Sequence, residues 1–185
     1  MHDRILNTAT SLFVERGFAG VAMREIAEAC GITKAALYYH FASKAQLLYA
    51  VCEGYLDVNA GVVEAVVAEG GTCEEQLRRL VHRLFEVPGE RRAILRLALH
   101  DLDSLDTPDQ EAFFDAYRER FTDPVERIFT EGAASGEFRS IDPGFLVWFM
   151  LGMAYPYFGL PGSTSAETEP GTVDVFLGGL RAPAS

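Results

Sequence analysis

The sequence of 185 residues predicts an all-α protein with a small N-terminal head and a larger helical body. Apolar residues recur three and four positions apart along most of the chain, as they do on one face of a helix. No segment shows the alternation of apolar and polar residues that is typical of a strand. Hydrophobic residues make up 49% of the chain and charged residues 23%, a balance that excludes a disordered or low-complexity protein.

Helix-capping and helix-breaking residues divide the first part of the chain into four predicted helices. Each of these segments carries apolar side chains at helical spacing and ends at a residue that is suited to stop a helix. The predicted segments, with their caps or stops, are residues 5–13 before Gly17, Met23–Ala29 before Cys30-Gly31, Thr33 to Tyr39, and Ser43 to Gly70-Gly71.

Further helical segments are predicted in the body. Thr72 and Glu75 have the spacing of a capping box, and a Thr-Pro or Asp-Pro step precedes three later segments as N-cap and first helical residue. Pro124 either starts a new helix or kinks one longer helix. The body segments are predicted to begin at Thr72, Arg91, Thr107-Pro108, Asp123-Pro124, Asp142-Pro143 and Val173, and Pro156 with Gly159–Gly162 is expected to bend or end the fifth of them early.

Charge is distributed unevenly along the chain. Residues 1–52 carry five basic and four acidic groups, a net charge of +1, whereas the remainder carries 11 basic and 23 acidic groups, a net charge of −12. Both lysines, Lys34 and Lys44, lie in the first segment. The difference predicts two domains with different partners, at residues 1–48 and 49–185. The overall charge of −11 excludes a generally basic nucleic-acid coat protein.

Cysteine usage and hydropathy favour a cytoplasmic protein without a membrane span. The three cysteines form no C-x-x-C pair, so neither a disulfide framework nor a structural zinc site is expected. The N-terminus shows no apolar core of a signal peptide. The uncharged run 144–166 is interrupted by two prolines and ends in polar residues, so it is predicted to be a buried helix.

Residues 22–41 have the pattern of a helix-turn-helix motif. Ala27 is small where two helices must cross closely, and Gly31 stands at the turn, where a positive φ angle would strain a residue with a Cβ atom. Ile26, Ile32 and Leu37 supply apolar contacts on the inner side. The second helix of such a motif is presented to the major groove of DNA.

The run from Arg24 to Phe41, followed by Ser43-Lys44 and Leu47-Leu48, resembles the DNA-binding domain of the TetR/AcrR transcriptional regulators. The resemblance covers residues 3 to about 50. Beyond it the similarity is architectural and includes a G-x-x-x-G-E-F-R stretch, Gly132 to Arg139, before a long apolar helix. The resemblance implies a homodimer that binds a palindromic operator, with an effector pocket in the C-terminal domain. Family members are mostly repressors that a small molecule releases from DNA.

The chain departs from the family pattern just before Arg24. The family usually has Thr or Ser there, as a helix cap and a phosphate contact, whereas this chain has Val21 and Ala22. Alanine in place of a capping residue costs about 1 kcal/mol. We therefore expect a slightly weaker affinity for DNA and an intact function.

The outward face of the second helix of the motif is predicted to contact DNA. Small side chains let the backbone approach base edges and touch thymine methyl groups, and hydroxyl, imidazole and basic groups bind phosphates. Arg24 has a second interpretation, because Glu28 lies four positions on and can pair with it. The predicted DNA-binding residues are Arg24, Thr33, Lys34, Ala35, Ala36, Tyr38, Tyr39, His40 and Lys44.

Aromatic residues are frequent in the body. They fit a core and a dimer interface, in which the segments Phe145–Leu160 and Val173–Leu180 form a four-helix bundle with a second copy. They also fit a pocket for a small apolar or aromatic effector. The predicted effector-binding residues are Phe114, Tyr117, Phe121, Trp148, Phe149 and Met153.

The sequence therefore predicts a ligand-responsive transcriptional repressor whose partners are double-stranded operator DNA, a small effector and a second copy of itself. No catalytic motif is present, and neither a catalytic residue nor a cofactor is predicted. No metal is predicted either, because His100 and Asp103 have i,i+3 spacing without a third ligand. A helical small-molecule-binding protein or enzyme and a TetR-like activator remain as alternatives.

Overall fold

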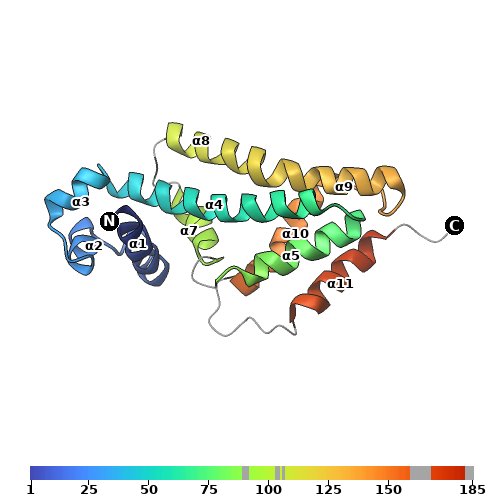
Figure 1. The fold of residues 1–185 in the computed structure, drawn as a ribbon, viewed down its shortest axis with the longest axis horizontal. Coiled ribbons are helices and arrows are strands. Elements are labelled where there is room, and N and C mark those ends of the chain that lie inside the picture. The colour runs from blue at the N-terminus through green and yellow to red at the C-terminus, as the bar shows by residue number, and fades with distance from the viewer. Residues whose placement is uncertain (89–91, 103–104, 106, 159–167, 182–185) are drawn as a thin grey trace. The chain divides into compact units, whose positions relative to one another are not determined.

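The computed structural model describes residues 1–88, 92–102, 105, 107–158 and 168–181. Within these residues the regular elements are helices, and extended pairing is limited to one isolated bridge between Phe138 and Arg181 (Figure 1). The all-α prediction is confirmed. The chain forms two compact units, Met1–Asp57 with Gly89–Asp115 and Val58–Pro88 with Ala116–Ser185.

The first unit gathers short helices around a small apolar core. Helix α1 packs against α2 and α7, and α2 packs against α3. Ile5, Ile26, Leu37 and Leu48, one from each of the first four helices, are fully buried. The helices are α1 (His2–Arg16), α2 (Met23–Ala29), α3 (Lys34–His40), α7 (Ile94–Asp101) and the beginnings of α4 (Lys44–Glu69) and α8 (Thr107–Tyr117).

The second unit has a core of its own. Helix α5 packs against α9 and α11, and α10 packs against both α9 and α11. Leu80, Val125, Val147 and Leu177, one from each of these helices, are fully buried. The elements are α5 (Cys73–Glu86), the π-helical segment η2 (Arg118–Thr122), α9 (Asp123–Ser135), α10 (Pro143–Phe158), α11 (Thr168–Leu180) and the ends of α4 and α8.

Side-chain caps form at four of the predicted helix starts. The side chains of Thr33, Ser43 and Asp142 each accept a hydrogen bond from the backbone N–H three positions on, at 3.1, 3.0 and 2.7 Å. Thr72 and Glu75 form the predicted capping box, with bonds of 3.2 and 2.9 Å. These four predicted helix starts are confirmed. They could be predicted because a cap depends only on residues within one turn of each other.

The predicted helix boundaries near the prolines and the predicted start of the last helix differ from those in the structure. Asp123-Pro124 does not start a separate helix, since η2 carries α8 directly into α9 and the Asp123 N–H bonds to the Arg118 carbonyl five residues back. A π turn of this kind accommodates the missing N–H of Pro124 inside a longer helix, the second possibility left by the sequence. Helix α8 begins at Thr107 itself, α10 continues past Pro156 to Phe158, and α11 begins at Thr168 rather than Val173.

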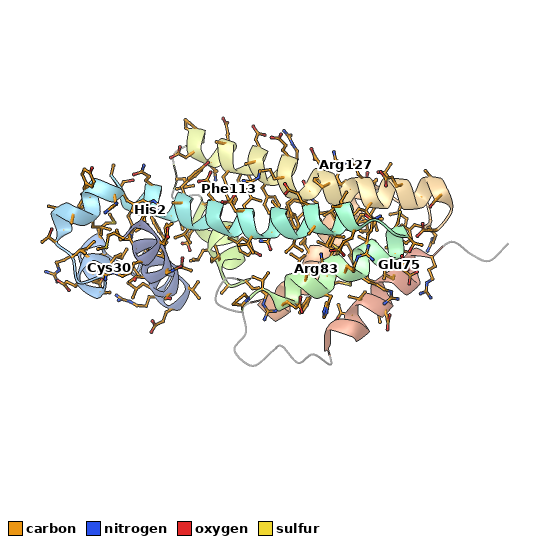
Figure 2. The ribbon with its side chains drawn as sticks, in the orientation of Figure 1. His2, Cys30, Glu75, Arg83, Phe113 and Arg127 are labelled. Atoms are coloured by element: carbon orange, nitrogen blue, oxygen red, sulfur yellow. The ribbon has the colours of Figure 1, made fainter. Side chains whose placement is uncertain are left out.

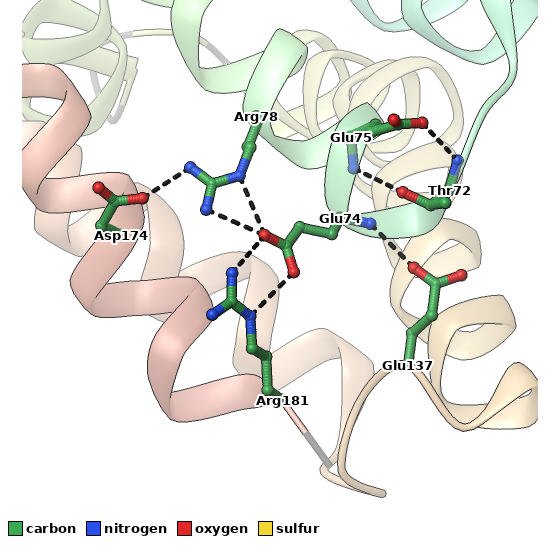
Figure 3. A network of polar contacts seen from close by, with 7 residues as sticks. All are labelled: Thr72, Glu74, Glu75, Arg78, Glu137, Asp174 and Arg181. Atoms are coloured by element: carbon green, nitrogen blue, oxygen red, sulfur yellow. Dashed lines mark hydrogen bonds and ion pairs between the residues drawn. The ribbon is translucent and has the colours of Figure 1, made fainter. Parts of the chain in front are cut away.

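Glu74, in the first turn of α5, joins three parts of the second unit (Figure 3). Its carboxylate accepts hydrogen bonds from Arg181 at 2.7 and 3.0 Å and from Arg78 at 2.9 and 3.1 Å. Arg78 also bonds to Asp174 at 2.7 Å, and the backbone N–H of Glu74 donates to Glu137 at 3.2 Å. The network therefore links α5 to the C-terminal end of α11 and to the turn that follows α9.

The arginines make Glu74 a source of pH-dependent stability. Hydrogen bonds from Arg181 and then Arg78 lower the pKa of the Glu74 carboxyl from 4.5 to about 2. A carboxyl whose pKa is lower in the folded than in the unfolded state stabilises the fold. This stabilisation is complete above the pKa of the unfolded state and is lost as the pH falls through the pKa of the folded state. Because the arginines are partly exposed, we expect Glu74→Gln to destabilise the protein at neutral pH by about 1 kcal/mol. In urea unfolding, the difference in the free energy of unfolding between Glu74→Gln and wild type should shrink between about pH 5 and pH 2. The control is Glu64→Gln, at an exposed position, which should show no such change. Equal effects of the two variants would contradict the assignment.

Gly132, on α9, lies where the chain turns back toward α11. The Phe138 N–H donates to the Gly132 carbonyl at 2.9 Å, and the Arg139 N–H donates to the Leu180 carbonyl at 2.8 Å. A Cβ atom on Gly132 would overlap the Phe138 ring and lie 3.1 Å from the Cys73 Cβ. The absent side chain therefore lets the Phe138 ring pack against the backbone of α9.

Within the described residues, no helix combines the length and the apolar character needed to cross a membrane. The thiols of Cys30, Cys52 and Cys73 are free and buried. Burial, reinforced by the charge of Asp101, raises the pKa of the Cys52 thiol to about 12, so this thiol stays protonated at neutral pH.

Candidate nucleic-acid interface

Helices α2 and α3 and their turn form the predicted helix-turn-helix motif. Gly31 has a φ angle of +62°, and the Ile32 N–H donates to the Ala27 carbonyl at 3.0 Å. Ala27 and Ile26 are buried on α2, and Leu37 is buried on α3. The positive φ angle is the one that the sequence predicts for Gly31, and it gives a reason for glycine at the turn.

Helix α3 exposes nearly every side chain that it carries. Leu37 is fully buried and anchors the helix to the core of the first unit. Lys34, Ala35 and Ala36 are exposed, as are Tyr38 and Tyr39, with Tyr39 88% exposed. Large aromatic side chains are seldom left so open to solvent unless they meet a partner. The exposed side of α3 therefore has the features of a contact surface.

The aromatic and basic groups of α3 contact one another along this surface. The Lys34 ammonium lies 5.6 Å from the centre of the Tyr38 ring, and the rings of Tyr39 and His40 meet edge to face at 5.6 Å. His2, at the start of α1, lies 6.4 Å from the His40 ring and 4.9 Å from Phe41 (Figure 2). Sequence reasoning missed His2, because it is too far from His40 along the chain to give a local signal.

Arg24, on α2, forms the ion pair with Glu28 that the sequence allowed as an alternative. Its guanidinium lies 3.3 Å from the Glu28 carboxylate, and both side chains are largely exposed. An exposed pair of this kind contributes a few tenths of a kcal/mol, which a phosphate would readily outcompete. The phosphate contact of Arg24 stays a prediction.

The missing cap of α2 is compensated in part by residues around it. The Ala22 side chain accepts no hydrogen bond, but the Glu25 carboxylate accepts one from the Ala22 N–H at 2.7 Å. Arg16 holds that carboxylate at 2.8 Å and also donates to the Gly20 carbonyl at 2.8 Å. The bond to the Ala22 N–H is the main cause that lowers the pKa of Glu25, followed by the bond from Arg16. One half of a capping box therefore remains, tied to the end of α1.

Restoring the missing side-chain acceptor of this capping box at position 22 should stabilise the head. In Ala22→Ser the new hydroxyl is placed to accept from the Glu25 N–H, and we expect a gain of about 1 kcal/mol in the free energy of unfolding. Ala22→Val, which adds no acceptor and is as poor an N-cap as alanine, should give no such gain. Chemical denaturation of both variants measures the difference, and an equal stability of the two would contradict the capping explanation.

Lys44 has partners inside the first unit. Its ammonium donates to the carbonyls of Phe18 at 2.8 Å and Val21 at 2.9 Å, and it lies 4.2 Å from the centre of the Phe18 ring. These contacts attach the start of α4 to the loop between α1 and α2. An ammonium group has three donors, so one remains for the predicted phosphate contact.

The other basic side chains of the head are also held by protein groups. Arg4 donates to the Cys30 carbonyl, at the end of α2. Arg16 pairs with Glu25, and Arg24 pairs with Glu28. Residues 1–52 are all described, and Lys34 differs from the other four basic residues there because it contacts an aromatic ring and no oxygen of the protein.

The predicted effector residues have different aromatic neighbours. On the second unit, the Tyr117 ring lies 5.3 Å from the Phe121 ring and stacks 6.5 Å from the Trp148 ring. Phe121 is buried, and Tyr117 and Met153 are partly exposed. Phe149 packs instead against Phe145 at 5.7 Å and Phe176 at 6.1 Å. Phe114 belongs to the first unit, where it contacts Phe113 at 6.1 Å.

Three aromatic side chains share an open face of α10. Phe145, Trp148 and Phe149 stand at positions i, i+3 and i+4 and are 58%, 57% and 48% exposed. Val175, on the neighbouring α11, is also exposed. Side chains this open do not enclose a ligand, so the placement of Trp148 and Phe149 favours the interface interpretation over the pocket.

Several predicted features lie outside the described residues. They include Asp103, residues 159–162 and the side chains of Thr107 and His100, so the spacing of His100 and Asp103 has no structural description. In the part of the chain that the structure describes, no three His, Cys, Asp or Glu side chains gather as a metal site would require. His82 is exposed and lies 3.5 Å from Glu86, one turn along α5.

Two family models match the chain. A model described as bacterial regulatory proteins of the tetR family matches residues 5–51, and a model described as a tetracyclin repressor-like C-terminal domain matches residues 70–155. The first match contains the α2–α3 motif and the second contains α5, α9 and most of α10.

Individual proteins are similar over nearly the whole chain. The transcriptional repressor KstR2 of Rhodococcus jostii (strain RHA1) is 26% identical, with 97% of this chain and 90% of that protein covered. The structure of AibR in complex with isovaleryl coenzyme A and operator DNA is 29% identical, with 99% of both chains covered and a TM-score of 0.82. The regulator PfmR of Thermus thermophilus is 27% identical, with 96% of this chain and 98% of that chain covered and a TM-score of 0.84.

Proposed function

Because the chain belongs to the TetR family of bacterial transcriptional regulators, we propose that it is a repressor that binds a palindromic operator as a homodimer and is released by a small apolar or aromatic effector. The observation that carries the proposal is helix α3, which buries Leu37 and exposes the remainder of its DNA-facing side. The exposed groups are small, aromatic or basic, the types that suit base edges and phosphates.

The DNA contacts divide between base edges and phosphates. Ala35 and Ala36 carry only methyl groups, so they let the helix backbone approach the groove and can touch thymine. Lys34, Tyr38 and Tyr39 project a cation and two hydroxyl groups from the same short helix, where phosphate oxygens border the groove. Thr33 is committed first as the cap of α3, and its hydroxyl oxygen accepts from the Ala36 N–H.

A homodimer accounts for the open face of α10. Phe145, Trp148 and Phe149 together with Val175 expose apolar area that a second copy would cover. A twofold arrangement of α10 and α11 gives a four-helix bundle. A dimer that reads a palindrome places its two recognition helices in successive turns of the major groove, about 34 Å apart. The dimer thereby explains why a palindromic operator is expected.

The effector is proposed to bind in the body and to act through α4. This helix begins in the first unit and continues into the second, so a ligand that favours one position of α4 changes the placement of the head. A tenfold loss of DNA affinity requires a difference of about 1.4 kcal/mol between the two states. Isovaleryl coenzyme A, whose acyl group is small and apolar although its coenzyme part is charged, is the first compound to test, because AibR was crystallised with it and shares the fold over 99% of both chains.

Fluorescence anisotropy tests the proposal. The full chain is titrated onto labelled DNA from immediately upstream of its own gene, with a scrambled duplex of the same composition as control, across a salt series. We expect tighter binding to the upstream DNA and a shallow dependence on salt, because the head has few cations to release counterions. Sedimentation of the complex should give two chains per duplex. Equal affinity for both duplexes at every upstream fragment tested would overturn the proposal.

A further inference from the structure

The loop of residues 17–22, which joins α1 to α2, surrounds the Lys44 ammonium with three of its groups. Two are the carbonyls of Phe18 and Val21, which accept hydrogen bonds from the ammonium at 2.8 and 2.9 Å. The third is the Phe18 ring, whose centre lies 4.2 Å from the ammonium, within the distance at which a cation and an aromatic ring attract each other. One cation of α4 therefore holds a loop that lies at least 23 positions earlier in the chain.

The place of Lys44 on α4 shows that its role lies in this loop. Helix α4 has 26 residues and no acidic side chain in its first turn, so its positive N-terminal end repels an ammonium group there. The two carbonyls present their negative oxygens to the ammonium and offset this repulsion. A lysine carries only donors and cannot cap the free N–H groups of α4, and the Ser43 hydroxyl caps the Gln46 N–H instead.

The carbonyls that Lys44 binds lie directly before α2. Val21 is 1% exposed, and its N–H donates to the Phe18 carbonyl at 3.3 Å. The next residue, Ala22, is the N-cap of α2, and its side chain accepts no hydrogen bond. The start of α2 therefore lacks an ordinary side-chain acceptor, and the contact with Lys44 holds it from outside the local sequence.

The attachment at the start of α2 extends to the recognition helix α3. Helices α2 and α3 pack against each other, and Ile26 of α2 and Leu37 of α3 are both fully buried in the core of the first unit. Residues 41–43 join α3 to α4 directly along the chain. Lys44 adds a contact at the other end of the motif, so the α2–α3 motif is attached to α4 at both of its ends.

We propose that Lys44 is a positioning residue for DNA binding, which ties the start of α2 to α4 and thereby holds the α2–α3 motif in the arrangement that fits the operator. This role rests on the proposed function, and it specifies how α4, the helix through which the effector is proposed to act, controls the motif. Loss of the contact lowers the fraction of heads in the binding-competent arrangement and raises the apparent dissociation constant in proportion.

Lys44→Met, which keeps an unbranched side chain and removes the donors, tests this role by anisotropy on the upstream duplex across a salt series. We expect binding about tenfold weaker, or roughly threefold for each head of a dimer, with the salt slope of wild type. The matched control is Lys34→Met, which should reduce the salt slope by about two, one phosphate contact for each half-site. A slope reduced by about two in Lys44→Met as well, or an unchanged affinity, overturns the proposal.

Hydrogen exchange of the free full chain needs no DNA and so separates this proposal from the proposed function. Lys44→Met should speed exchange of the Ile26 and Cys30 amides, which donate to the carbonyls of Ala22 and Ile26 at 3.3 and 2.9 Å, at least about threefold. Amides of α5, in the second unit, should keep their rates. Unchanged rates in α2, or equal acceleration in α2 and α5, overturn the positioning role. Wild type without preference for the upstream duplex overturns the proposed function instead, and the exchange rates then decide whether Lys44 holds the motif.

Discussion

Lys34→Ala combined with Tyr38→Ala is expected to abolish most of the affinity for the operator. The Lys34 ammonium lies 5.6 Å from the centre of the Tyr38 ring on the exposed side of α3, so both groups are placed for the same stretch of DNA backbone. Loss of about 1 kcal/mol at each half-site acts twice in a dimer and weakens binding about 30-fold. Anisotropy should also show a salt slope that is smaller by about two, one phosphate contact for each Lys34.

Single substitutions separate the contributions to this effect. Tyr38→Phe removes only the hydroxyl group and should lose part of what Tyr38→Ala loses. Arg127→Ala removes an exposed cation from α9 of the body and should leave operator affinity unchanged. If Arg127→Ala weakened binding as much as Lys34→Ala, the effect would come from total charge, and the assignment of the interface to α3 would be wrong.

Gly132→Val is expected to destabilise the second unit more than any other single change considered for its fold. The new side chain would overlap the Phe138 ring and crowd Cys73, and the buried ring has little space to move into. Overpacking of this kind costs about 3 kcal/mol, which lowers the melting temperature by roughly 6–12 °C for a chain of this size. Chemical and thermal unfolding measure both quantities.

A double-mutant cycle identifies the cause. Phe138→Ala alone leaves a cavity and should destabilise the protein, but it removes the ring that a side chain at position 132 would meet. Gly132→Val in the Phe138→Ala background should therefore cost much less than in wild type. Gly61→Val, at an exposed position of α4 with no atom within 4 Å of a Cβ, serves as the control. Strict additivity would contradict the steric explanation.

Features that depend on neighbouring residues could be predicted from the sequence. The caps at Thr33, Ser43 and Thr72 and the turn at Gly31 each involve groups within a few positions of one another, so a single sequence contains the information. The helix-turn-helix motif is predictable for the same reason, since its inner residues recur at helical spacing within one short segment.

Features that join distant segments could not be predicted. The bond between Glu74 and Arg181 spans 107 positions, and neither residue has a local signal for the other. The place of Lys44 in the first turn of a helix predicts a phosphate contact, but the carbonyls of Phe18 and Val21 that it also binds are set by tertiary packing. Trp148 is apolar in any window of sequence, and only the fold shows that it faces outward.

The hydrogen bonds and ion pairs of the basic side chains of the head affect how strongly the protein binds DNA outside its operator. Two of the five basic residues within 1–52 pair with carboxylates and two more bond to backbone carbonyls, so Lys34 is the cation that can bind a phosphate without giving up an oxygen of the protein. Non-specific affinity comes almost entirely from phosphate neutralisation, so this head should adhere weakly to random DNA. Millions of non-operator sites then retain few copies, and a small cellular pool of the protein is sufficient to occupy its operator.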